Sequence, residues 1–181
     1  MTIVRFEPIA EEHLPEVLSI YNHYVEHTTV SFHTETLSLE QMRAQIMNVP
    51  AHYKSYVIVE EPFHETESAL SLSASSTSSI AGYILMTQHK NKQAYDVTAE
   101  VTVYLKPGQT GRGLGGKSLS FLEQAGIESG FHVLIATVCT ENVNSIALFE
   151  RYGYEKCAHF REVGYKFGRR LDIASYQKII G

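Results

Sequence analysis

The chain has 181 residues, and 44% of them are hydrophobic, which is enough for one core in a single domain covering residues 1–181. The formal net charge of -5 argues against a nucleic-acid-binding surface, because such surfaces usually carry clustered Lys and Arg in excess. We therefore expect a protein that acts on small molecules and has no nucleic-acid partner.

The sequence gives no sign of a membrane or metal partner. No signal peptide is recognisable and no apolar run is long enough to cross a bilayer, so we expect a cytoplasmic protein. Cys139 and Cys157 lack a C-x-x-C spacing, which indicates free thiols in a reducing compartment. His23 and His27 are four residues apart on an expected helix, but no third ligand accompanies them, and we expect no metal.

The N-terminal part predicts one strand followed by two helices. Residues 2–7 are rich in β-forming side chains, and apolar residues then recur at helical spacing over residues 11–27. Ser38 and Gln41 have the spacing of a capping box, which predicts a second, short helix that ends before Pro50.

Residues 28–36, between these helices, mix hydroxyl side chains with Phe32 and follow neither the helical nor the strand period. A loop that faces a substrate and a plain connection both account for this composition. The sequence alone leaves the two alternatives open.

The middle of the chain predicts three strands and a long insertion. Residues 55–60 and 80–87 have the composition of strands, and the serine-rich residues 64–79 between them indicate a long, flexible hairpin insertion. Residues 97–105 give the longest strand pattern, in which apolar and polar residues alternate. This alternation assigns Glu100 to the polar face of the strand.

The C-terminal part predicts two helices and three strands, and so completes an α+β fold with a mixed sheet and helices on its faces. A helix should follow the glycine-dense residues 106–116 and stop near Gly130. The continuous apolar run 131–138 predicts a strand buried on both faces. A last helix begins at residues 140–145. The β-like runs 154–161 and 166–179 predict two final strands.

The glycine-dense turn before the first of these helices indicates an anion site. Glycines let the backbone approach a ligand closely, and the first turn of a helix offers unpaired N–H groups at its positive dipole end. Residues 111–116 also match the letters of G-x-G-x-x-G, and residues 111–118 match those of G-x-x-x-x-G-K-[ST]. Neither nucleotide motif has its usual context, since no acidic residue ends the following apolar run.

An ordered series of motifs resembles the GNAT superfamily of N-acetyltransferases, and more narrowly its phosphinothricin and methionine sulfoximine acetyltransferase family. The first part of the series is Glu100, then Val103-Tyr104-Leu105-x-Pro, then a glycine turn at residues 110–115. The family resemblance adds the segments Asn22-His23-Tyr24, Thr29-Val30-Ser31-Phe32, Ala94-Tyr95-Asp96, Asn142-x-x-Ser145 and Val163-Gly164-x-Lys166-Phe167-Gly168-Arg169. It covers nearly the whole chain and implies a central mixed, mostly antiparallel sheet flanked by helices.

The resemblance implies acetyl-CoA as the acetyl donor. The backbone of Val103, Tyr104 and Leu105 would pair with the pantetheine arm, and Asn142 would bond the pantetheine or acetyl region, with Ser145 in the same site. The pyrophosphate would be held by the amides of the glycine turn, with added charge from Arg112; the residues of this turn are Gly111, Arg112, Gly113, Leu114, Gly115 and Gly116.

The resemblance also implies a general base and an acceptor pocket. Glu100 would take the proton of the acceptor amine, directly or through water, and a backbone N–H within residues 103–105 would stabilise the oxyanion. The acceptor would be a small-molecule amine, the α-amine of an amino acid or analogue. Its pocket would use Phe32, Lys92, Gln93, Ala94 and Tyr95.

Three positions depart from the family pattern. Thr110 replaces the usual Arg or Gln at the head of the glycine turn, and Phe149 replaces the Tyr that many members use to protonate the leaving thiolate. Lys92 stands where relatives often have Arg, so a bidentate contact with an anion would become a single-point contact.

The family is typically dimeric, and residues 163–172 would form a candidate hairpin contact in a homodimer.

Two rival functions remain besides the acetyltransferase. One is a CoA-binding regulatory module that has lost catalysis, which Phe149 and Thr110 suggest. The other is a nucleotide-binding protein that uses the turn at residues 111–118.

Overall fold

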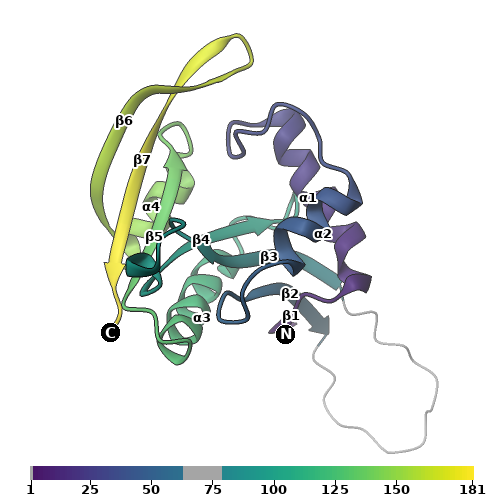
Figure 1. Cartoon of the computed structure of the whole chain (residues 1–181). Helices are drawn as coiled ribbons and strands as arrows, with labels where there is room; N and C mark the ends of the chain where they lie inside the picture. Colours follow the sequence, from purple (N-terminus) through teal and green to yellow (C-terminus); the bar gives the residue numbers. More distant parts are fainter. Residues whose placement is uncertain (1, 63–78) are drawn as a thin grey trace, which may run out of the picture.

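The computed structural model of the chain describes residues 2–62 and 79–181. The predicted serine-rich insertion at residues 64–79 therefore lies outside the described residues, except for Ser79, which begins a strand. Over the described ranges the chain folds around one sheet, as Figure 1 shows.

The sheet has seven strands in the order β1-β2-β3-β4-β5-β7-β6, and every neighbouring pair is antiparallel except β4 and β5. The mixed, mostly antiparallel sheet expected from the sequence is confirmed. The strand bounds are β1 Thr2–Pro8, β2 Ser55–Pro62, β3 Ser79–Gln88, β4 Thr98–Leu105, β5 Val133–Cys139, β6 Glu155–Lys166 and β7 Arg169–Ile179.

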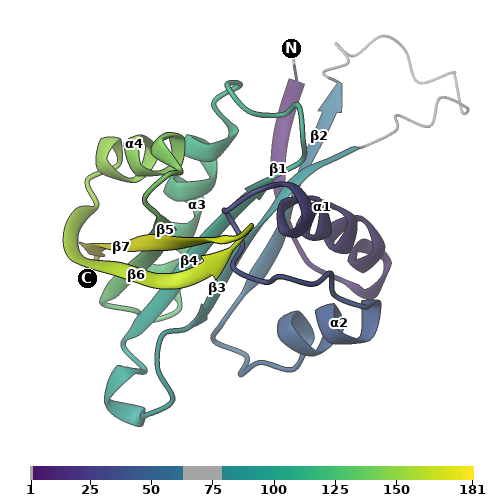
Figure 2. The ribbon, with the colours of Figure 1, turned by 90° about the horizontal axis from the view of Figure 1, so that it is seen from above.

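Four α-helices cover the two faces of the sheet, with α1 and α2 on one side and α3 and α4 on the other (Figure 2). Two 3-10 turns, η1 and η2, complete the described elements. The bounds are η1 Glu11–His13, α1 Leu14–His27, α2 Leu39–Met47, η2 Gln93–Tyr95, α3 Leu114–Glu128 and α4 Val143–Arg151. The predicted capping box of α2 is present, since the Gln41 amide donates to Ser38 Oγ at 3.2 Å and the Ser38 amide donates to Gln41 Oε1 at 2.8 Å.

Strand β4 contributes to both cores because its side chains alternate between the two faces of the sheet. Ala99 and Val101 are buried under α3, as the alternation predicts. The opposite face, predicted to be polar, is covered at its far end: Tyr104 is buried there among the rings of Tyr21, Tyr24 and Tyr83. The polar face is therefore open to solvent only toward Glu100 and Thr102.

Two sequence expectations for the C-terminal part are corrected. Strand β5 is not buried on both faces, because Thr137 is exposed and Ile135 is only half-buried on the side where no helix covers the strand. The last hairpin turns later than predicted. Strand β6 continues to Lys166, and the turn lies at Phe167 and Gly168, which take positive φ angles of 51° and 76°.

The parallel strands β4 and β5 pair over only part of their length. Their register runs from Thr98 with Val133 to Glu100 with Ile135, although both strands continue well beyond these residues. The C-terminal half of β4 consequently has no strand partner on the β5 side. Because unpaired backbone N–H and C=O groups need other partners, this separation marks a place for a ligand.

The packing of α3 on α4 depends on glycine in the first turn of α3. A Cβ atom added at Gly116 would lie 1.9 Å from Tyr152 Oη and 2.7 Å from Tyr152 Cζ, so the aromatic ring occupies the space of the missing side chain. Gly116 thus has a packing role in addition to any role in ligand binding.

We expect Gly116→Ala to lower the free energy of unfolding by about 1–3 kcal/mol, since displacing the Tyr152 ring should outweigh the helical preference of Ala. Chemical denaturation measures the change. Ser120→Ala, at an exposed position of the same helix, is the control and should stay within about 0.5 kcal/mol of the parent chain. A Gly116→Ala protein as stable as the parent would contradict this account.

Candidate active site

The unpaired half of β4 presents backbone groups to the gap between the two strands. The Lys106 amide donates to Ala81 of β3 at 2.8 Å, so by the alternation of a β-strand the even-numbered residues face β3 and the odd-numbered ones face the gap. Leu105 O already accepts a hydrogen bond from Tyr24 Oη at 2.6 Å. The N–H and C=O of Val103 are left to bind a ligand.

The glycine turn supplies a second set of backbone donors beside this edge. Gly113, with a φ of 78°, is the N-cap of α3, and the first backbone bond into that turn joins the Lys117 amide to Gly113 O at 3.2 Å. The preceding amides of Leu114, Gly115 and Gly116 are the free donors that every helix N-terminus leaves. They lie at the positive end of a 15-residue helix, which favours an anion.

Three adjoining cavities follow the gap from one face of the sheet to the other. We name them the glycine-side cavity, of about 490 Å³, the connecting channel, of about 110 Å³, and the loop-side cavity, of about 410 Å³. Val30 lines all three. The glycine-side cavity and the channel also share Val103, Asn142, Ser145 and Phe149, so they adjoin.

The glycine-side cavity contains most of the residues predicted to hold the donor. It is lined by Thr110, Gly111, Gly113, Gly115 and Gly116, together with residues of β4, α1 and α4. Its remaining lining residues are Tyr24, Val30, Val103, Leu105, Asn142, Asn144, Ser145, Leu148, Phe149 and Arg151. Thus loop, strand edge and α4 converge on one cavity, as the sequence prediction requires of a long ligand with a phosphate group.

Asn142 and Phe149 lie where the glycine-side cavity enters the channel. Asn142 Oδ1 accepts a hydrogen bond from the Ser145 amide at 3.2 Å, which makes it the N-cap of α4. Phe149 is buried, with its ring edge-to-face on Tyr154 at 5.1 Å between centroids. Phe149 therefore has no hydroxyl group that could donate a proton at this position.

The loop-side cavity lies at the other end of the channel, which shares Tyr104, Thr137 and Cys139 with it. Its other lining residues are Tyr21, Val30, Ser31, Phe32, His33 and Ile173. Inside it, Ser31 Oγ donates to Tyr21 Oη at 2.9 Å, and Tyr21 Oη lies 2.5 Å from His33 Nδ1. Burial raises the pKa of Tyr21 and of Tyr104 above the usual value for tyrosine, so both hydroxyls stay protonated.

The loop that carries Phe32 is fixed from both of its sides. The amide side chain of Asn22 binds Leu37 O at 3.0 Å and the Leu37 amide at 2.9 Å. From the β6–β7 hairpin, Lys166 Nζ donates to Ser31 O at 2.7 Å. The Phe32 ring lies against Gly164, where an added Cβ would be 2.2 Å from Phe32 Cε2. Residues 28–36, left open by the sequence, are thus an ordered wall of a cavity.

Glu100 lies outside the lining of these three cavities, on the open end of the β4 face that also carries Thr102 and Tyr104. Its Oε1 lies 2.8 Å from Nδ1 of His89, which follows β3. The two side chains of this pair are 33% and 18% exposed, respectively. Glu100 is therefore a half-buried carboxylate held by an imidazole, two residues along the strand from the channel residue Thr102.

The predicted acceptor residues are divided between two places. Phe32 lines the loop-side cavity, whereas Gln93, Ala94 and Tyr95 form the turn η2, with Lys92 as its N-cap. This turn is linked to Glu100 through His89, whose ring lies edge-to-face on Tyr95 at 5.8 Å. The fold thus links the turn η2 to the predicted base through Tyr95 and His89, and no residue of this turn lines the cavity that contains Phe32.

Arg112 makes its contacts with protein groups. Its Nη1 and Nη2 donate to the two Glu60 carboxylate oxygens at 2.8 and 2.9 Å, and Nη1 also binds Gln109 Oε1. Glu60 is buried on β2, so this bidentate pair ties the glycine turn to the sheet. A charge contact from Arg112 to a phosphate, suggested by the sequence, would have to compete with Glu60.

Several cavity residues were not singled out from the sequence as site residues: Tyr21, Tyr24, His33, Thr137 and Cys139. Tyr21 and Tyr24 follow the apolar period of α1 and therefore resemble ordinary core residues. Thr137 and Cys139 interrupt the apolar run of β5 with polar or reactive side chains, and this interruption is the local pattern that could have indicated them.

Comparisons with known proteins give similarities in sequence and in fold. The sequence pattern of the Acetyltransferase (GNAT) family matches residues 19–154, about three quarters of the chain. The phosphinothricin N-acetyltransferase of Streptomyces coelicolor is 32% identical over 177 residues, which are 97% of this chain and 95% of that protein. The L-methionine sulfoximine/L-methionine sulfone acetyltransferase of Salmonella typhimurium is 29% identical, over 89% of this chain and 85% of that protein.

A solved structure shares the whole fold. It is an acetyltransferase from Salmonella typhimurium, determined with its cofactor acetyl-CoA, and it superposes with a TM-score of 0.81 at 26% identity. The match covers 99% of this chain and 94% of the other.

Among the residues that our structure describes, no helix is long and apolar enough to span a membrane.

We expect Arg112→Ala to lower the free energy of unfolding by roughly 1.5–3 kcal/mol, because it leaves the buried Glu60 carboxylate without its charged donor. Arg5→Ala is a matched control, since Arg5 pairs with the neighbouring Glu61 at an exposed position and should contribute less than about 1 kcal/mol. Urea denaturation measures both. Equal losses for the two variants would mean that the Arg112–Glu60 pair does not anchor the turn.

Proposed function

Because the chain belongs to the acetyltransferase (GNAT) family, we propose that it is an N-acetyltransferase that uses acetyl-CoA as donor and the α-amine of a small amino acid or analogue as acceptor. The acceptor class is that of phosphinothricin and of methionine sulfoximine or sulfone, on which the similar enzymes named above act. The single observation that carries the proposal is the channel between β4 and β5, which joins a cavity at the glycine turn to a second cavity on the other face.

The glycine-side cavity fits the donor on chemical grounds. The free amides of Leu114, Gly115 and Gly116 at the N-terminus of α3 suit a pyrophosphate. The free edge of β4 suits a pantetheine arm, because an amide N–H of the arm can donate to the Val103 C=O and leave the Val103 N–H free. Thr110 lines the same cavity, and its replacement of Arg or Gln leaves these backbone donors in place.

The reaction requires the acceptor nitrogen to attack the thioester carbon while the carbonyl oxygen takes up negative charge. The Val103 N–H, at the junction of the glycine-side cavity and the channel, is the oxyanion donor in this proposal. The carbon–sulfur bond then breaks, and the thiolate leaves. Phe149, which lies nearby, supplies no proton to it.

Glu100 accepts the proton that the amine loses, through water. Two residues of strand separate it from Thr102, which is roughly 7 Å at the rise of a β-strand, so a direct bond to an amine in the channel is too long. The His89 imidazole holds the carboxylate in place. The position of the carboxylate on the open face, with solvent access, supports this role.

We expect Glu100→Gln to lower kcat by about 10²–10⁴-fold while the affinity for acetyl-CoA stays unchanged, because the variant loses a general base and no cofactor contact. Thiol release from acetyl-CoA, followed with an amino-acid panel, measures the rate, and calorimetry measures the affinity. Glu155→Gln, on exposed β6, is the control. An unchanged kcat for Glu100→Gln would remove Glu100 as the base.

A thermal-shift assay with acetyl-CoA, ATP and NAD, together with the amino-acid panel, separates the rival functions. Stabilisation of the fold by ATP or NAD but not by acetyl-CoA would contradict the proposal and favour a nucleotide-binding protein. Binding of acetyl-CoA without turnover of any amine in the panel would favour a regulatory module that senses CoA.

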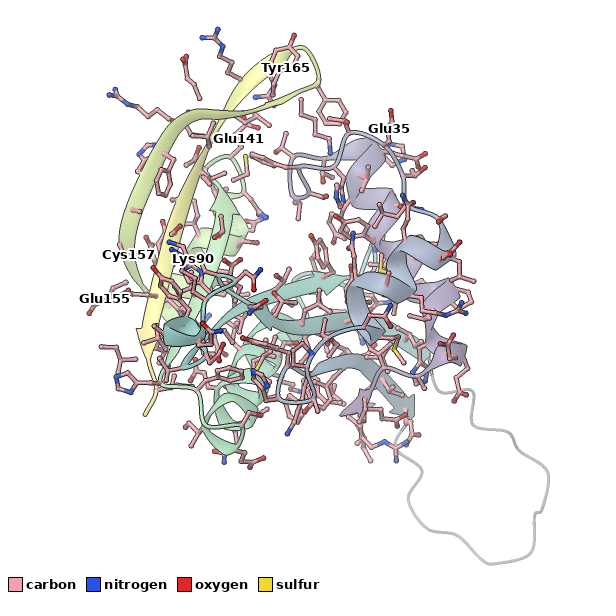
Figure 3. All side chains as sticks on the ribbon, in the orientation of Figure 1. Glu35, Lys90, Glu141, Glu155, Cys157 and Tyr165 are labelled. Atoms are coloured by element: carbon pink, nitrogen blue, oxygen red, sulfur yellow. The ribbon has the colours of Figure 1, made fainter. Side chains whose placement is uncertain are left out.

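We further propose that the protein works as a cytoplasmic homodimer whose contact includes the β6–β7 hairpin. This hairpin exposes apolar side chains, and Tyr165 near its end is 68% exposed (Figure 3). The others are Phe160, Val163 and Phe167. Large exposed apolar side chains of this kind supply the apolar area that interfaces bury, and a large apolar patch is unusual on a monomer.

We expect Tyr165→Asp combined with Phe160→Asp to convert a dimer into a monomer, because each charge would have to be buried unpaired in the contact. Sedimentation velocity gives the mass of each species. Ile127→Asp, at an exposed apolar position of α3, is the control and should leave the dimer intact. A parent chain that sediments as a monomer at micromolar concentration would refute the dimer.

A further inference from the structure

We propose that the loop-side cavity binds an oxyanion of the acceptor through His33, with Tyr21 fixing the imidazole, and that the acceptor's amine lies at the channel end. This inference rests on the proposed function and adds a specificity site to it. Neither Tyr21 nor His33 belongs to the residues that the sequence predicted for the acceptor.

The orientation of the acceptor follows from which residues the cavity shares with the channel. Tyr104, Thr137 and Cys139 line both, so they mark the end where the acetyl group arrives. Tyr21 and His33 line the loop-side cavity and not the channel. An acceptor whose nitrogen attacks the thioester therefore has its amine near Thr137 and its other polar group near His33.

A chain of hydrogen bonds sets the tautomer of His33. The His33 amide donates to Ser31 Oγ at 3.2 Å, and Ser31 Oγ donates to Tyr21 Oη at 2.9 Å. Because Tyr21 Oη accepts from Ser31, we assign its own proton to the contact with His33 Nδ1, 2.5 Å away. With Nδ1 as acceptor, Nε2 carries the other proton and is the donor available to a ligand.

The charges around the cavity favour an anion over a cation. Its lining includes no Asp or Glu, although the chain has a net charge of -5. Behind the wall, the buried Lys166 ammonium donates to Ser31 O at 2.7 Å, and no ion pair joins it to a carboxylate within residues 2–62 and 79–181. Glu141, which contacts Thr29 of the same loop, is neutralised by Arg169.

The ligand class is an amino acid that presents an oxyanion to an imidazole N–H. In phosphinothricin two groups have this chemistry, the α-carboxylate and the phosphinate of the side chain. The loop is rigidly placed by Asn22, Lys166 and the Phe32–Gly164 contact, so its donors are preorganised for one of these groups.

The test compares acceptors with and without each oxyanion. His33→Phe keeps an aromatic ring but removes the donor, and we expect it to raise KM for phosphinothricin at least tenfold with KM for acetyl-CoA unchanged. His33→Gln keeps an N–H donor and should recover part of the loss. Tyr21→Phe frees the imidazole tautomer and should raise KM by a smaller factor. His27→Phe, at an exposed position of α1, is the control and should change nothing.

Two acceptor pairs identify the anion. If the carboxylate is bound, His33→Phe should raise KM for free methionine sulfone. It should not raise KM for the methyl ester of methionine sulfone, in which the carboxylate is masked. If the phosphinate is bound, free methionine, which lacks it, should be insensitive to His33→Phe. An equal rise in KM for every acceptor, or no rise for any, would overturn the proposal.

Calorimetric titration of phosphinothricin into the CoA-bound protein provides a readout without turnover. A parent chain that binds phosphinothricin but acetylates no amine would refute the proposed function, and loss of that binding in His33→Phe would still support the anion site. Equal binding by the parent and by His33→Phe, or no binding by the parent, would overturn the anion site whatever the activity.

Discussion

The separation of β4 from β5 is the constraint on which the rest of the site depends. Two parallel strands that stop pairing after Glu100 and Ile135 leave backbone groups without partners and open the sheet from one face to the other. One face then receives the glycine turn and α4, and the other receives α1 and the loop at residues 28–36. A channel through the sheet can hold a donor and an acceptor on opposite sides, so that they meet only at the reacting atoms.

The two sides of the channel present different kinds of groups, backbone amides on one side and side chains on the other. On the glycine side, ligand contacts come mainly from backbone amides, which are fixed by a helix N-terminus and a strand edge and are therefore insensitive to side-chain replacement, as with Thr110. On the loop side, contacts come from side chains that hydrogen-bond one another, including Ser31, Tyr21 and His33. This division between backbone contacts and side-chain contacts would suit enzymes that share one donor and differ in their acceptors.

The β6–β7 hairpin connects the loop-side cavity with the surface of the molecule. It holds the loop through Lys166 and Gly164, and it exposes Tyr165 near its end, as Figure 3 shows. Glu141 and Arg169 add an ion pair between the hairpin and the end of β5. Association through this hairpin would consequently act on the wall of the loop-side cavity.

The sequence by itself determined the features that depend on neighbouring residues. The periods of α1 and β4, the capping box at Ser38 and Gln41, and the glycine turn before α3 are local patterns, and each has its expected structure. The tertiary structure decided what depends on distant segments: the burial of Tyr104 under α1, the exposure of Thr137, the engagement of Arg112 by Glu60, and the meeting of Tyr21 with His33. Strand separation and side-chain contacts are set by the packing of the whole sheet and its helices, and no local spacing encodes them.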